Sequence, residues 1–113
     1  MKEITKQEFV KRITSKKSVF LGGTRQKLTD EQIIHNTEAM WTAKQNGSLI
    51  QSRKARAGSN FNITFSDDTH LSIGGNLAKV FEINENIIGV ILYYEDKTVW
   101  QYMYYALESK TSK

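Results

Sequence analysis

The main chemical feature of the sequence is positive charge, which is densest in the stretch Arg53-Lys54-Ala55-Arg56. Lysine and arginine bind phosphate groups, and each phosphate neutralised in this way adds salt-dependent affinity for a nucleic acid. Other cations of the N-terminal half could join one face of this stretch if the chain folds back on itself. The alternative is a solvated edge strand, on which positive charge discourages aggregation. The candidate nucleic-acid-binding residues are Lys16, Lys17, Arg25, Lys27, Arg53, Lys54 and Arg56.

The charge is distributed unevenly along the 113 residues, whose net charge is +4. Residues 1–57 contain twelve lysines and arginines against five acids, a net charge of +7. Residues 58–113 contain four basic and seven acidic residues, a net charge of −3, and nine of the twelve aromatic residues. Such an asymmetry favours a polyanionic partner for the first half of the chain.

The segment Gly22-Gly23-Thr24-Arg25 has the composition of a loop that could bind an anion. Consecutive glycines let backbone N–H groups approach a phosphate, to which Thr24 and Arg25 could also donate hydrogen bonds. The segment lacks the spacing of a nucleotide-binding loop, and a Gly-Gly pair after a strand is commonly a simple turn. The sequence leaves both interpretations open.

Residues suited to catalysis or metal binding are few. His35 and His70 are the two histidines, and the absence of cysteine removes thiolate ligands and thiol nucleophiles. Asp67 and His70 could lie near one turn, but two ligands do not complete a metal site. No serine lies in a nucleophile-elbow sequence. We therefore expect a protein that is not an enzyme and that holds no metal and no cofactor.

Hydrophobic periodicity predicts two helices and a strand-rich remainder, which must together position the basic residues. Thr5 and Thr29 each begin a capping-box pattern, and the pair Asn46-Gly47 is typical of a helix end. The Gly22-Gly23 pair is expected to end a short strand. The predicted elements are helices over 6–14 and from the second capping box to Asn46-Gly47, a strand over 18–21, a β-hairpin over 60–73, and strands over 79–83, 87–94 and 98–107.

The last two predicted strands are apolar or aromatic on both faces, which is typical of strands covered on both sides or closed into a barrel. We therefore expect a single α+β domain over residues 1–108, with two N-terminal helices and a strongly curved, mostly antiparallel sheet or small β-barrel. Residues 109–113 are expected to form a polar tail. The longest apolar run, Ile87–Tyr94, is far shorter than the roughly 20 residues of a membrane-spanning helix. We expect a cytoplasmic protein that does not contact a membrane.

A basic, cysteine-free chain of this size, with two helical segments around Gly22-Gly23-Thr24-Arg25 and a strand-rich remainder, resembles the PrgU-type proteins. These are small regulators encoded by conjugative plasmids and mobile elements of enterococci and their relatives. The resemblance covers nearly the entire chain and implies a PUA-like fold, a compact β-barrel with added helices. It also implies RNA binding that restrains expression of transfer or adhesin genes. It assigns no role to individual residues of this chain.

Two functional hypotheses follow. The first is a non-enzymatic RNA-binding regulator that acts post-transcriptionally by occupying a segment of a transcript. The second is a small protein-binding module or inhibitor encoded by a mobile element, which would use an aromatic patch including Tyr93, Trp100 or Tyr104, or a dimer interface along the last strand. Base stacking would strengthen the first hypothesis. The aromatic residues considered for stacking are Tyr93, Tyr102, Tyr104, Phe61 and Phe65.

Overall fold

Two helices form where the capping patterns predict them. In the computed structural model, which describes residues 1–108, α1 spans Lys6–Ser15 and α2 spans Asp30–Gln45. The hydroxyl of Thr5 accepts the first-turn N–H of α1, and a complete capping box begins α2. Both helix predictions are confirmed because they rest on local hydrogen bonds that satisfy the free N–H groups of a helix start.

Five antiparallel strands form the main sheet, in the order β1-β6-β7-β8-β2. The three predicted C-terminal strands are confirmed and lie next to one another in this sheet. A further strand, β1, was not predicted, because three residues carry too short a pattern to be recognised. The bounds are β1 Lys2–Ile4, β2 Ser18–Thr24, β6 Ala78–Asn84, β7 Ile87–Tyr93 and β8 Val99–Leu107.

A second, three-stranded antiparallel sheet has the order β3-β4-β5 and contains the predicted hairpin. Its strands are β3 Ala55–Ala57, β4 Asn62–Phe65 and β5 His70–Ser72, with a short 3₁₀ turn, η1, at Ser59–Phe61. An antiparallel bridge between Ser18 and Arg53 links this sheet to the edge of the main sheet. Each of these two residues donates its N–H to the other's carbonyl, at 2.9 and 2.8 Å.

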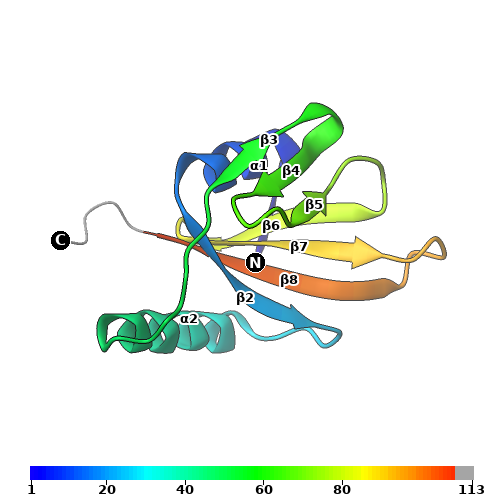
Figure 1. The fold of residues 1–113 in the computed structure, drawn as a ribbon. Coiled ribbons are helices and arrows are strands. Elements are labelled where there is room, and N and C mark those ends of the chain that lie inside the picture. Colours follow the sequence, from blue (N-terminus) through cyan, green and yellow to red (C-terminus); the bar gives the residue numbers. More distant parts are fainter. Residues whose placement is uncertain (109–113) are drawn as a thin grey trace.

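The main sheet is the middle layer of the molecule (Figure 1). On one face it packs against α1 and the small sheet, through a core that includes Phe9, Ile63 and Ile88. On the other face it packs against α2, through a core that includes Ile33 and Ile87. Successive residues of a strand point to opposite faces, so the continuous apolar run of β7 supplies both cores. This explains why its sequence lacks alternation.

One expectation needs correction. The Gly22-Gly23 pair does not end the second strand, because β2 continues to Thr24. The pairing with β8 shifts register between Phe20 and Gly23, and Gly22 adopts φ +99°, so glycine serves a bulge there. The predicted α+β class with mostly antiparallel strands is confirmed. The strands of residues 1–108 form two sheets, and no closed barrel is found among them. The predicted tail, residues 109–113, lies outside the described residues.

Candidate nucleic-acid interface

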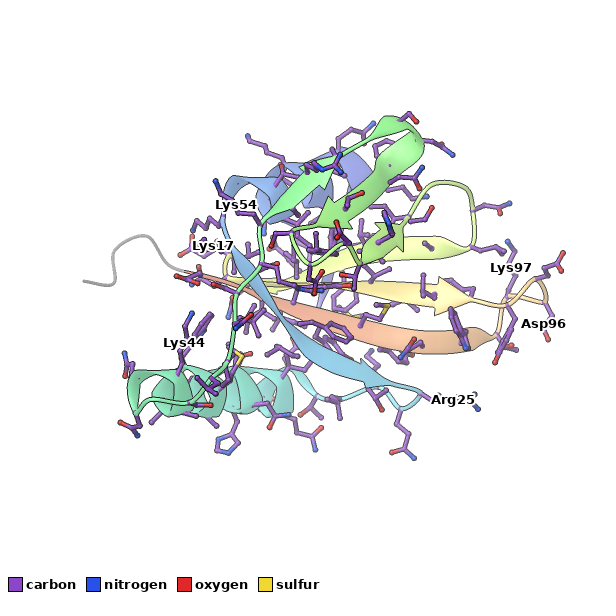
Figure 2. The ribbon with its side chains drawn as sticks, in the orientation of Figure 1. Lys17, Arg25, Lys44, Lys54, Asp96 and Lys97 are labelled. Atoms are coloured by element: carbon purple, nitrogen blue, oxygen red, sulfur yellow. The ribbon has the colours of Figure 1, made fainter. Side chains whose placement is uncertain are left out.

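The Ser18–Arg53 bridge places two lysines from distant parts of the sequence side by side. Lys17 and Lys54 each adjoin a bridge partner, and antiparallel pairing puts both at the same end of the bridge. Both are exposed, and Figure 2 shows them close together beside the start of β2. Lys16, at the C-terminal cap of α1, precedes Lys17 directly. We call Lys16, Lys17, Lys54 and Arg56 the basic junction.

The exposed face of the small sheet continues this surface. Lys54 and Arg56 alternate with Ala55, so they share the face that points away from the core. The register sets Arg56 opposite Thr64 and Thr64 opposite His70, so these three side chains form one row across the strands. The Thr64 hydroxyl lies 3.1 Å from His70 Nδ1. Sequence reasoning missed His70 as part of this surface, although its alternation with Leu71 is a usable signal.

Arg53 has a different role from its neighbours. Its Nη1 donates to Asp67 Oδ2 at 3.0 Å and to the Thr69 hydroxyl at 2.8 Å, and its guanidinium carbon lies 4.2 Å from the centre of the Phe65 ring. The side chain is 18% exposed. Hydrogen bonds from the Thr69 hydroxyl and backbone N–H, and then the contact with Arg53, lower the pKa of Asp67 to about 2. Arg53 therefore holds the turn between β4 and β5, and an acid already balances its charge.

Arg25 and Lys27 are exposed, but they lie away from the basic junction. They follow the C-terminal end of β2, whereas Lys17 precedes its start, and Figure 2 shows Lys17 and Arg25 at opposite ends of the strand. Seven residues at about 3.3 Å each separate the two ends by roughly 20 Å. The structure thus divides the seven candidate residues into the four residues of the basic junction, the structural residue Arg53, and the separate pair Arg25 and Lys27.

An acid lies close to the junction at the end of β8. Glu108 donates its backbone N–H to the Lys17 carbonyl, and its carboxylate accepts from Lys44 Nζ of α2 at 3.2 Å. A hydrogen bond from the Ser52 hydroxyl, together with Lys44 and Lys17, holds the pKa of Glu108 below its usual value, against the opposing effect of burial. These contacts tie the end of β8 to both α2 and the basic junction.

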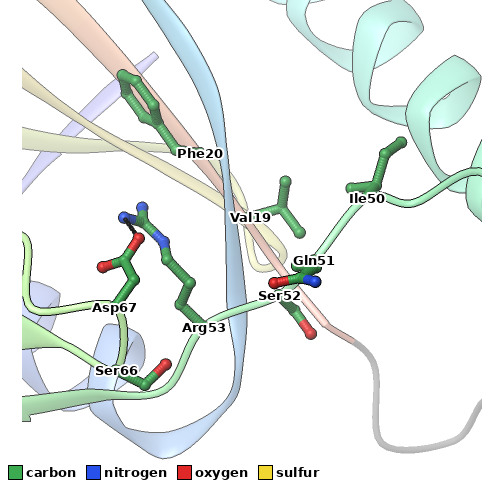
Figure 3. A pocket seen from close by; sticks show the side chains of 8 residues that line it. All are labelled: Val19, Phe20, Ile50, Gln51, Ser52, Arg53, Ser66 and Asp67. Carbon is green, nitrogen blue, oxygen red and sulfur yellow. Dashed lines mark hydrogen bonds and ion pairs between the residues drawn. The ribbon is translucent and has the colours of Figure 1, made fainter.

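A hollow of about 450 Å³ opens beside the bridge, where β2 and the segment 50–53 diverge (Figure 3). We call it the β2 hollow. Phe20 is 39% exposed in its wall, and its ring centre lies 5.3 Å from that of Tyr105. The hollow depends on the approach of two distant segments, so no local pattern could have indicated it. It is lined by Val19, Phe20, Ile50, Gln51, Ser52, Arg53, Ser66 and Asp67.

The aromatic residues considered for stacking differ in exposure. Tyr104 and Phe65 are 3% exposed, so a nucleobase cannot reach their faces, and Tyr93, Tyr102 and Phe61 are half-buried. The well exposed aromatic pair is instead Tyr94 and Trp100, at 47% and 43%, with ring centres 6.4 Å apart. We call this pair the aromatic tip.

The dimer interface that was considered along the last strand is excluded as an edge pairing. The backbone of β8 is already hydrogen-bonded on both sides, by β7 and β2. Trp100 can still reach a partner because its side chain projects from the sheet face. A protein interface at this end would therefore have to use side chains.

Comparison with known proteins gives no assignment: the chain matches no protein-family model, no curated protein and no solved structure. In residues 1–108 no three metal-binding side chains come together. Across the same residues, no helix is long and apolar enough to cross a membrane.

Proposed function

We propose that this protein is a non-enzymatic, cytoplasmic RNA-binding regulator that covers a segment of a transcript and so alters its translation, termination or decay. The observation that carries the proposal is the convergence of Lys17 and Lys54 at the Ser18–Arg53 bridge. Two cations brought together from distant segments, and continued by Arg56 and His70 along an exposed sheet face, make a surface suited to a phosphate backbone.

Each cation has a proposed part in this binding. Lys16, Lys17, Lys54 and Arg56 contact phosphates at the junction and supply affinity without sequence preference. Arg53 holds the β4–β5 turn in place. Arg25 and Lys27 contact only an RNA long enough to follow β2 to its other end.

The resemblance to the PrgU-type proteins supports the regulatory part of the proposal. We propose that the two sheets, joined at the Ser18–Arg53 bridge, are an open variant of the PUA-like barrel that this resemblance implies. The exposed face of the small sheet and the start of β2 would then form the surface that contacts the transcript.

A salt titration of the purified protein with labelled single-stranded RNAs, with double-stranded DNA as competitor, tests the proposal. We expect micromolar or tighter binding near physiological salt and a preference for RNA over the DNA. The slope of log affinity against log salt should correspond to the release of several counterions. Binding that disappears by about 150 mM salt and is displaced equally by DNA would show only that the protein is basic.

The aromatic tip favours a second candidate function, a protein-binding module. Tyr94 and Trp100 are exposed together at the end of the molecule opposite Lys17 and Lys54 (Figure 2 labels Lys97 at this end). Exposed tyrosine and tryptophan are frequent anchors of protein interfaces. A self-association measured by analytical ultracentrifugation that is lost in Trp100→Glu, with RNA binding absent from the wild type, would favour this function over RNA regulation.

A further inference from the structure

The β2 hollow adjoins the basic junction along both strands that form the bridge. Val19 follows Ser18 on one side, and Ser52 precedes Arg53 on the other, so the hollow begins where the bridge ends. Lys17 and Lys54 lie at the opposite end of the same bridge. A phosphate bound by these lysines would therefore lie close to the hollow. We infer that the β2 hollow receives one unpaired nucleobase of the bound RNA, an inference that rests on the proposed function.

Phe20, in the wall of the hollow, is the outermost of three aromatic rings that contact one another in series, followed by Tyr105 and Phe65. The ring centres of Phe20 and Tyr105 lie 5.3 Å apart with 40° between their planes, and those of Tyr105 and Phe65 lie 5.9 Å apart with 12° between their planes. The Arg53 guanidinium lies over the Phe65 ring. Tyr105 and Phe65 are buried, whereas Phe20 leaves 39% of its surface open. A base that stacks on Phe20 would extend this series by one ring. Because Phe20 already packs against the buried Tyr105, its ring loses little conformational freedom when a base binds.

The polar lining can bind the edge of a base. Figure 3 shows the Arg53 guanidinium beside Asp67 on the same side of β2 as Phe20. Within residues 1–108, both hydrogen bonds of the Arg53 side chain come from Nη1, which leaves its other N–H groups for the edge of a base. The Ser66 hydroxyl accepts the Lys54 N–H, and so keeps its own proton for a further acceptor. Gln51 adds an exposed amide with both a donor and an acceptor.

The balance of these groups sets a base preference. Asp67 already accepts from Arg53 on one oxygen and from the Thr69 N–H and hydroxyl on the other, so it has little capacity left for a base amino group. The remaining groups are mainly donors, from Arg53 and Ser66. Guanine and uracil carry carbonyl acceptors on their edges, whereas adenine presents an amino donor. We therefore expect guanine or uracil to be preferred over adenine.

The test compares short RNAs that differ at a single position. Fluorescence anisotropy is measured with labelled octanucleotides that carry guanine, uracil, adenine or an abasic site at one central position, in an otherwise identical sequence. We expect guanine or uracil to bind severalfold more tightly than adenine, and the abasic RNA to bind most weakly. Phe20→Leu should weaken binding of the guanine or uracil RNA by between about fivefold and about 150-fold, the range that loss of one stacked base gives.

Matched variants separate stacking from folding and from charge. Phe20→Tyr keeps an aromatic face and should bind like the wild type, whereas Phe20→Leu keeps an apolar contact with Tyr105 and should keep the wild-type melting temperature. Trp100→Leu removes an exposed aromatic ring of the aromatic tip and should leave RNA binding unchanged. Phe20→Leu should not alter the already weak binding of the abasic RNA.

The outcomes distinguish this inference from the function on which it rests. RNA binding that is indifferent to the abasic site and to Phe20→Leu would overturn the base pocket and leave the proposed function standing. Absence of RNA binding in the wild type would remove both. If guanosine or uridine monophosphate alone binds as tightly as the octanucleotide, the occupant is a free nucleotide and the inferred RNA contact is wrong. Cross-linking of a 4-thiouridine RNA to Phe20 or Gln51, located by mass spectrometry, would support the pocket directly.

Discussion

Neutralising the two lysines at the Ser18–Arg53 bridge should change the salt dependence of RNA binding by a calculable amount. Lys17→Gln with Lys54→Gln removes two of the four cations of the basic junction. Each phosphate contact on a single strand contributes about −0.7 to the slope of log affinity against log salt. Four contacts predict a slope of about −2.8 for the wild type, and two predict about −1.4 for the double variant.

These slopes correspond to measurable differences in affinity. Between 50 and 200 mM salt, the wild-type affinity should fall by about fiftyfold and that of the double variant by about sevenfold. Both lysine side chains are exposed, so the melting temperature should be unaffected. The assay is fluorescence anisotropy of a labelled single-stranded RNA in a series of potassium chloride concentrations.

A second double variant controls for net charge. Lys79→Gln with Lys97→Gln makes the same charge change at exposed positions outside the basic junction. Lys79 lies in β6, and Figure 2 shows Lys97 at the end of the molecule away from Lys17 and Lys54. Its slope should equal that of the wild type. If the two double variants show the same slope, binding depends on overall charge, and the assignment of a local phosphate site to the bridge is refuted.

Two further predictions concern stability. Gly89→Ala should lower the free energy of unfolding by about 1–3 kcal/mol, because the added Cβ would meet the Phe81 ring and lie 2.7 Å from the Met103 carbonyl oxygen. Gly23→Ala, whose Cβ would meet the flexible end of a glutamine side chain, should cost much less, and equal losses in urea unfolding would contradict the packing argument. Because the pKa of Asp67 falls from 3.8 to about 2 on folding, its stabilising contribution should be complete above about pH 4 and lost as the pH falls towards 2. Melting temperatures of wild type and Asp67→Asn should therefore converge across this window, and parallel curves would show that the carboxylate contributes nothing.

The elements that could be predicted from the sequence are those with local causes. Thr5 and Thr29 bond to N–H groups three residues away, so the helix starts need no tertiary contact. The β4–β5 hairpin follows from alternation on either side of the turn at Asp67, whose carboxylate accepts the Thr69 N–H. The β2 bulge was not predicted because a Gly-Gly pair is compatible with a turn and with a strand, and pairing with β8 decides between them.

The candidate site could be predicted only in part. Charge density in the sequence selected all four residues of the basic junction, but it also selected Arg25 and Lys27, which lie at the other end of β2. It did not distinguish Lys54, which is exposed, from Arg53, which an acid and an aromatic ring engage. The distinction arises because Arg53 contacts Asp67 and Thr69 of the β4–β5 turn. These partners lie more than ten residues away in the sequence, so the residues next to Arg53 do not reveal the contact.

By itself, the sequence determined the helices, the hairpins, the apolar strands that need cover on both faces, and the excess of positive charge in the first half. These properties depend on neighbouring residues, whose hydrogen bonds and alternation are set by the backbone geometry of a few positions. Tertiary structure alone decided that Ser18 pairs with Arg53, and so which cations meet, which aromatic rings stay exposed and where a hollow opens. The physical reason is that contacts between distant segments are selected by the packing of the whole core, which no short stretch of sequence contains.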